Sequence, residues 1–228
     1  MKHVGVLLSL AAAAAGAAIG SRSLPESGPP LPMGEIGWEG SVIPGGPLVK
    51  IWGADLDDIE AKIKKDHPDF SMFLDVPNEA DPVESSENPA VEAVDALEKR
   101  RNGNCDSRFG KADVGYYNDG VHNLRRINGN RCVARARTCI RTQCVRTSAI
   151  GLCNDNHHEI TVQCTDIANM ADTIRLHCGF SRWPLVCAPG RPCQILEHWT
   201  HGQEFANSGN WNVLAGSCGY FGGGERPV

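Results

Sequence analysis

Apolar residues in two stretches of the chain's second half recur every three or four positions, the spacing that predicts an amphipathic α-helix. The first stretch covers residues 113–127, where Asp113 can cap the start of the helix. The second covers residues 166–178, with Thr165 as its cap and Gly179 directly after its last residue. The apolar stripes are Val114, Tyr117, Val121 and Leu124 in the first helix and Ile167, Ala171 and Ile174 in the second.

Between these helices the hydrophobic pattern changes to the period of two that is typical of β-strands. Over residues 131–141, small and apolar side chains alternate with arginines, which predicts one strand with an apolar and a basic face. Residues 143–147 and 149–153 are expected to form a hairpin, and residues 211–217 a last strand. These elements predict an α+β fold with two helices and an antiparallel sheet.

The first hundred residues follow a different pattern. An apolar run followed by small residues predicts a secretory signal peptide over residues 1–20. We expect residues 21–100 to be an acidic pro-segment that is largely disordered, with short helices beginning after Asp55 and at Pro89. Because no other apolar stretch approaches the length of a membrane span, no transmembrane segment is expected.

Charge divides the chain at one place. Residues 21–100 hold 17 acids against 7 bases, whereas residues 101–228 hold 10 acids against 14 bases. The dibasic pair Lys99-Arg100 lies at this boundary, which predicts cleavage by a kexin-type processing protease and a mature domain over residues 101–228. The charge split suggests the hypothesis that the acidic segment masks the basic domain or assists its folding.

All ten cysteines lie after residue 104, which makes the predicted mature domain rich in disulfides. Secretion would place them in an oxidising compartment, and their even number favours complete pairing. Since no two are spaced as Cys-x-x-Cys, neither a metal nor another cofactor is expected. The pairing stays open, but cysteines at both ends of the second helix indicate that both ends are stapled to the sheet. The ten are Cys105, Cys132, Cys139, Cys144, Cys153, Cys164, Cys178, Cys187, Cys193 and Cys218.

The chain contains no familiar hydrolase motif: Gly-x-Ser-x-Gly, His-Glu-x-x-His and the P-loop are all missing. His198 and His201 form the densest cluster of histidines, and we interpret them as residues of a loop spanning 181–201. Residues 154–156 read as a turn whose side chains hydrogen-bond the backbone. We therefore predict no catalytic residues, while a small secreted hydrolase stays an alternative.

The basic face of residues 131–141 is the best candidate binding surface. Its arginines would attract phosphate or acidic polysaccharide. The competing interpretation is a charged edge strand that discourages aggregation. The four residues are Arg131, Arg135, Arg137 and Arg141.

Five features of the sequence together resemble a family of small secreted cysteine-rich proteins of filamentous ascomycete fungi. They are Ile43-Pro44-Gly45-Gly46-Pro47, Lys99-Arg100, Cys139-x4-Cys144-x8-Cys153-Asn154-Asp155-Asn156, Asp166-Ile167-Ala168 leading to His177-Cys178-Gly179, and Gly209-Asn210-Trp211-Asn212-Val213 ending at Cys218. The family is distantly similar to necrosis-inducing effectors and KP-type killer toxins. The resemblance implies a small disulfide-rich α/β sandwich, an antiparallel sheet with two helices packed on one face. The chain departs from the family in Cys187, Cys193 and Gly151-Leu152, the last replacing expected aromatics.

These observations predict a secreted, extracellular effector or toxin-like protein that is processed after Lys99-Arg100 and acts outside the producing cell without catalysis. Its expected partners are the kexin-type protease and an extracellular target: the surface, wall polysaccharide or membrane protein of another cell. We do not expect nucleic acid as a partner. One alternative is a small secreted cationic ribonuclease. Another is a cell-wall or polysaccharide-binding module.

Overall fold

The structure is a computed structural model that describes residues 28–74, 103–129, 131–182 and 197–222. Below, "the N-terminal segment" means residues 28–74 and "the cysteine-rich part" means the described residues from 103 onward. Several predicted features lie outside the described residues: the signal peptide, the Lys99-Arg100 site, the helix at Pro89, Cys187 and Cys193.

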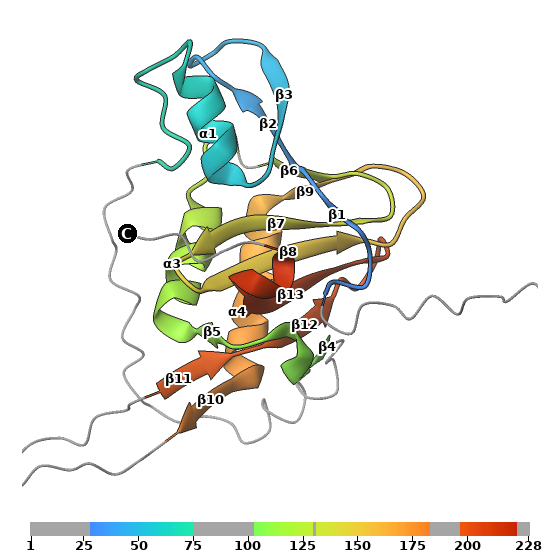
Figure 1. The fold of residues 1–228 in the computed structure, drawn as a ribbon. Helices are drawn as coiled ribbons and strands as arrows, with labels where there is room; N and C mark the ends of the chain where they lie inside the picture. Colours follow the sequence, from blue (N-terminus) through green and yellow to red (C-terminus); the bar gives the residue numbers. More distant parts are fainter. Residues whose placement is uncertain (1–27, 75–102, 130, 183–196, 223–228) are drawn as a thin grey trace, which may run out of the picture.

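A six-stranded sheet forms the centre of the molecule (Figure 1). Its strands run in the order β1-β7-β8-β13-β12-β4, and every neighbouring pair is antiparallel except β1 with β7. The predicted hairpin and last strand are therefore confirmed. The strands are β1 (Met33–Gly34), β7 (Thr138–Val145), β8 (Ser148–Asn154), β13 (Trp211–Ser217), β12 (Gly202–Phe205) and β4 (Gly103–Asn104).

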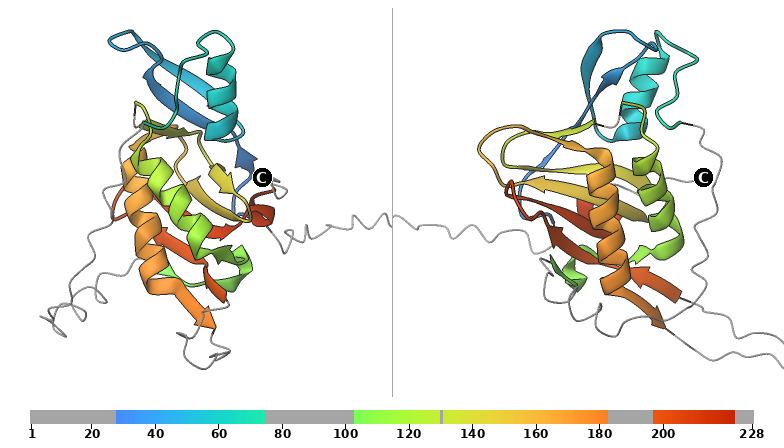
Figure 2. Two further views of the ribbon diagram at one scale, coloured as in Figure 1. Left: turned by 90° about the vertical axis from the view of Figure 1, so that its left-hand side faces the viewer. Right: turned by 180° about the vertical axis from the view of Figure 1, so that it is seen from behind.

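Two helices, α3 (Val114–Arg125) and α4 (Cys164–Cys178), lie side by side on one face of this sheet (Figure 2). The predicted fold class, a small disulfide-rich α+β sandwich, is confirmed. Asp113 caps α3 as predicted, because its carboxylate accepts hydrogen bonds from two backbone N–H groups. The predicted cap of α4 at Thr165 is wrong: the helix begins at Cys164, directly after a strand, and is held there by a disulfide.

The opposite face of the sheet carries a second apolar cluster. It is covered by two short helical turns, η1 (Ser107–Phe109) and η2 (Cys218–Phe221). Gly151, which replaces an aromatic residue expected from the family resemblance, makes room for this layer. A Cβ atom at Gly151 would lie 2.2 Å from the ring of Phe221. Because both faces are covered, all seven residues of β8 are buried.

The N-terminal segment folds, so the prediction of a largely disordered segment is wrong for residues 28–74. It forms β2 (Ile36–Ser41), β3 (Leu48–Gly53) and the predicted helix α1 (Leu56–Lys64), which lie at one end of the molecule (top in Figure 1). Together with two strands of the cysteine-rich part they make a four-stranded sheet in the order β3-β2-β6-β9. The two added strands are β6 (Arg131–Ala134) and β9 (Ile160–Gln163).

The prediction of one continuous strand over residues 131–141 is also wrong. β6 ends at Ala134 and β7 begins at Thr138, and the two strands belong to different sheets. The side-chain amide of Asn154 donates to the carbonyl oxygens of Ala134 and Arg135, at 3.2 and 3.0 Å, and so stabilises the break. Arg137, within the turn, has a positive φ of 53°.

A small third sheet replaces part of the loop predicted over residues 181–201. Its strands β10 (Gly179–Arg182), β11 (Glu197–Thr200) and β5 (Ala112–Asp113) run in the order β10-β11-β5. Gly179 thus leads directly from α4 into a strand, and its backbone is extended (φ −73°, ψ 131°).

Four disulfides join residues of the described chain, and two of them hold the ends of α4. Cys164 at its start bonds to Cys132 of β6, and Cys178 at its end bonds to Cys105 beside β4. Both bridges join Cα atoms 5.2 Å apart. Both helix ends are therefore held by disulfides, as predicted, but not to a single sheet: the start is joined to the four-stranded sheet and the end to the residue that follows β4 of the central sheet. The other two bridges, on the opposite face of the central sheet, are Cys139–Cys153 and Cys144–Cys218.

Candidate functional site

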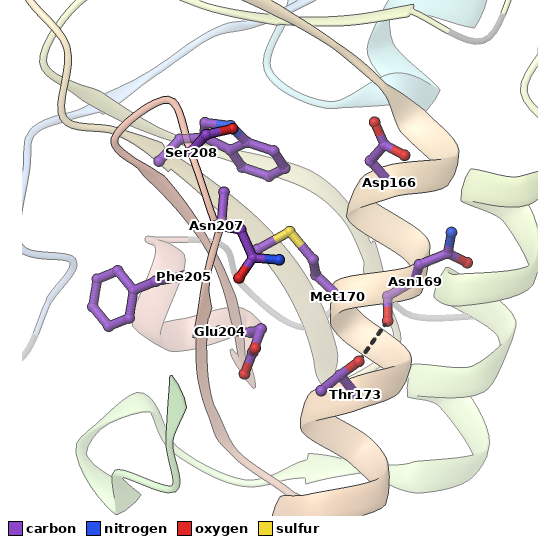
Figure 3. Close-up of a pocket in the computed structure, with 10 residues that line it drawn as sticks. Asp166, Asn169, Met170, Thr173, Glu204, Phe205, Asn207 and Ser208 are labelled. Atoms are coloured by element: carbon purple, nitrogen blue, oxygen red, sulfur yellow. Dashed lines mark hydrogen bonds between the residues drawn. The ribbon is translucent and has the colours of Figure 1, made fainter. Parts of the chain in front are cut away.

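A groove of about 400 Å³ runs between α4 and the β12–β13 hairpin, and we call it the α4 groove (Figure 3). One wall comes from the outer side of the helix, and the other comes from the hairpin and its connecting loop. The groove is open to solvent, so a ligand can reach its lining residues. Its lining residues are Asp166, Asn169, Met170, Thr173, Glu204, Phe205, Ala206, Asn207, Ser208 and Trp211.

The helical wall follows from the period of α4. Positions 166, 169, 170 and 173 lie three or four residues apart and share one side of the helix, whereas Ile167, Ala171 and Ile174 are buried in the core. The Thr173 Oγ1 hydroxyl donates to the carbonyl oxygen of Asn169 at 3.1 Å (Figure 3). The wall therefore combines a carboxylate, an amide and a hydroxyl with the thioether of Met170.

The opposite wall is a hairpin loop in a defined conformation. The backbone N–H of Ala206 donates to the carbonyl oxygen of Trp211 at 2.9 Å, which closes the loop. Gly209 and Asn210, at its tip, have positive φ angles of 94° and 48°. Trp211 is only half-buried: its indole packs against the main core and also lines the groove. Phe205, at the end of β12, is 40% exposed.

Hydrogen bonds from the turn at residues 154–156 hold this loop in place. The backbone N–H of Asp155 donates to the carbonyl oxygen of Asn210 at 3.0 Å, and the side-chain amide of Asn156 donates to the same oxygen at 3.2 Å. Asn156 also donates to the carbonyl oxygen of Gly209. The buried Asn154 accepts from the Asn156 backbone at 2.9 Å. The predicted side-chain-to-backbone hydrogen bonds are confirmed for Asn154 and Asn156, whereas Asp155 contributes its backbone N–H. The turn positions one wall of the groove.

The α4 groove is electronegative. Its ten lining residues include the carboxylates of Asp166 and Glu204 and no lysine, arginine or histidine. A smaller depression of about 140 Å³ shares Thr173 and Glu204 with the groove and continues along α4 past His177. Since a carboxylate at each wall repels anions, this surface is suited to a neutral or cationic ligand.

The structure does not gather the four predicted binding arginines on one strand face. Three of them contact acids of the N-terminal segment, and the fourth lies near an acid in the turn that supports the groove. Their role in binding stays a prediction. The N–O distances are 3.1 Å for Arg131–Glu39, 3.7 Å for Arg135–Glu35, 3.0 Å for Arg141–Asp55 and 3.8 Å for Arg137–Asp155.

His198 and His201, the histidines weighed for a ribonuclease, do not converge. The ring of Phe180 stacks on both Trp199 and His201, at centroid distances of 6.5 and 5.2 Å, so these two share one side of the sheet. His198 precedes Trp199 in β11 and therefore points to the other side. His201 is 7% exposed, and burial lowers the pKa of its imidazole.

Among the residues that the structure describes, no group of three or more His, Cys, Asp or Glu side chains is placed to hold a metal ion. In the same residues, no helix has both the length and the apolar character needed to cross a membrane.

Comparison with known proteins gives no identification. No family model matches the chain, and no match was found among the curated proteins or the solved structures. The resemblance to fungal secreted proteins therefore stays a prediction. The groove itself was missed in the sequence because its walls come from segments more than thirty residues apart. The one available signal was the Gly209-Asn210-Trp211-Asn212-Val213 motif, which includes an aromatic residue of the site.

Proposed function

We propose that this protein is a secreted, disulfide-stabilised effector or toxin-like protein that acts outside the producing cell by binding and not by catalysis. We further propose that the α4 groove is its binding site and that the ligand is an uncharged carbohydrate of a cell surface or wall. The proposal joins the predicted effector role to the alternative of a polysaccharide-binding module.

The chemistry of the α4 groove carries this proposal. Sugar rings present apolar C–H faces that pack on an aromatic side chain and hydroxyl groups that need polar partners at the edges. Trp211 supplies the aromatic surface, while Asn169, Asn207 and Asp166 supply donors and acceptors on both walls. The carboxylates accept hydrogen bonds from sugar hydroxyls but disfavour acidic polysaccharides, so specificity for neutral chains follows.

Disulfide content supports the extracellular part of the proposal. Four bridges within the described chain are typical of proteins that fold and work in an oxidising environment. Two of them hold α4 at its ends, which keeps the helical wall of the groove fixed. A preorganised wall lowers the entropy cost of binding an extended ligand.

The test is retention of the purified protein on insoluble chitin and β-glucan, with polygalacturonate as the acidic comparison. We expect binding to the neutral polymers alone. Asn169→Ala should weaken it roughly five- to tenfold, the effect of losing about one hydrogen bond. Asn118→Ala removes another exposed asparagine, from α3 and outside the groove, and should leave binding unchanged.

Two outcomes contradict the proposal. If neither neutral polymer retains the protein, or if both variants behave alike, the α4 groove is not a carbohydrate site. If incubation shortens the polysaccharide or degrades added RNA, the protein is an enzyme. Growth arrest or necrosis of target cells exposed to the purified protein, lost in Asn169→Ala, would connect the groove to the effector role.

A further inference from the structure

The N-terminal segment and the cysteine-rich part share one sheet and one core. β2 pairs antiparallel with β6 and places Trp38 opposite Cys132. The Trp38 side chain is fully buried, and its Nε1 donates to the carbonyl oxygen of Asn128 at 2.5 Å. The apolar residues of β2 and α1 belong to the same buried cluster as those of α3 and α4. Neither part therefore has a complete core alone.

The contacts reach both ends of the segment. At its start, β1 runs parallel to β7. At its end, the backbone N–H of Asn128 donates to the carbonyl oxygen of Met72 at 2.7 Å, and that of Leu74 donates to the carbonyl oxygen of Arg126 at 2.9 Å. Backbone pairing at both ends fixes the segment in one register along the cysteine-rich part.

Charged and polar side chains add to the same interface. Arg141 pairs with the buried Asp55 at 3.0 Å, and Arg131 pairs with Glu39 at 3.1 Å. The Gln143 amide donates to Asp57 at 3.1 Å. The interface therefore joins an acidic surface to a basic one, as well as burying apolar residues.

No disulfide can join the two parts, because every cysteine of the chain lies after residue 104. The covalent link between them is the backbone of residues 75–102, which contains the Lys99-Arg100 pair. We propose that, once the chain is cut after Arg100, the N-terminal segment stays bound to the cysteine-rich part without a covalent bond. The processed protein is then a two-chain molecule. This inference goes beyond the proposed function and does not depend on it.

The test replaces residues 95–100 with the recognition sequence of a site-specific protease, so that cutting does not depend on the native pair. After complete cleavage, size-exclusion chromatography should give one peak that contains both fragments. In denaturant without reductant the two fragments should elute apart, because no disulfide joins them. Separate elution of the fragments under native conditions would overturn the proposal.

Two variants test whether the packing described here causes retention. Ile36 is fully buried, whereas Ile43 is 57% exposed, and both belong to the segment. In the cut protein, Ile36→Ala should speed dissociation of a labelled segment about tenfold or more, the effect of a buried isoleucine truncation. Ile43→Ala should leave the rate unchanged. Equal rates for the two variants would contradict the proposed interface, even if the fragments co-elute.

Discussion

Replacing Asp55 with asparagine separates two roles of one buried carboxylate. Its Oδ1 accepts a hydrogen bond from the backbone N–H of Asp58 at 3.0 Å and caps α1. Its Oδ2 pairs with the Arg141 guanidinium at 3.0 Å. Asparagine caps a helix about as well as aspartate does, so Asp55→Asn keeps the cap and removes the charge.

The expected cost follows from burial. Removing one partner of a buried ion pair destabilises a protein by about 3–5 kcal/mol, because the other charge stays out of water without compensation. The Asp55 side chain has no exposure and that of Arg141 has 13%, so some solvent reaches the remaining cation. We therefore expect a loss of about 3 kcal/mol in the free energy of unfolding, measured by urea denaturation with the disulfides intact.

Two further variants test whether the lost charge, and not the lost cap, causes the destabilisation. Asp113→Asn keeps the cap of α3 at an exposed position and should change stability by less than about 0.5 kcal/mol. Asp55→Asn combined with Arg141→Met removes both charges and should be more stable than Asp55→Asn alone, because no unpaired charge stays buried. A loss below about 1 kcal/mol in the single variant, or no recovery in the double variant, would refute the reasoning.

Two more predictions concern the turn at residues 154–156 and the buried His201, which follows β11 of the third sheet. Asn154→Ala deprives the carbonyl oxygens of Ala134, Arg135 and His158 of a shared donor, and should cost about 2–4 kcal/mol in urea denaturation, with Asn118→Ala as a neutral control. Burial lowers the pKa of His201, so the unfolded chain, with its imidazole pKa near 6.5, takes up a proton more readily than the folded one. Stability should therefore fall as the pH drops from about 7.5 to 5.5, and His201→Gln should reduce that fall; equal slopes for the two proteins would contradict this.

The helices could be predicted from the sequence because their signals are local. Asp113 caps the start of α3, and the apolar stripe of that helix is buried as expected. Asp55 likewise caps α1, whose apolar stripe is also buried. Both caps act within three residues along the chain, so neighbouring positions contain the information. The start of α4 was misplaced because it depends on Cys164, whose disulfide partner lies 32 residues away.

Strand β2 escaped prediction because its glycines indicate a loop. A Cβ atom at Gly37 would lie 2.8 Å from the Val133 side chain on the neighbouring strand. Glycine is therefore required here by a close approach between two distant segments, and it is not a sign of disorder. The signal that could have identified the strand was the alternation of Ile36 and Trp38, both fully buried.

The break at residues 135–137 escaped prediction for a similar reason. The alternation of arginines with small residues continues across the break. The chain nevertheless leaves the sheet of β6 after Ala134, where the Asn154 side-chain amide donates to the carbonyl oxygens of Ala134 and Arg135. The α4 groove depends on a helix and a hairpin that meet only in the folded chain. Such features depend on contacts between residues that are far apart in the chain, and local patterns in one sequence do not reveal those contacts.

The charge division of the chain now has a structural meaning that bears on function. Four arginines were predicted to form a binding surface, and three of them form contacts with acids of the N-terminal segment. The Arg141 side chain is 13% exposed and pairs with the buried Asp55 that caps α1, so freeing it for an anionic ligand would disturb the start of α1. The lining of the α4 groove includes no residue of the N-terminal segment, so the groove is accessible while the segment is in place. Because the arginines already contact acids, the groove is the better candidate for the binding site proposed above.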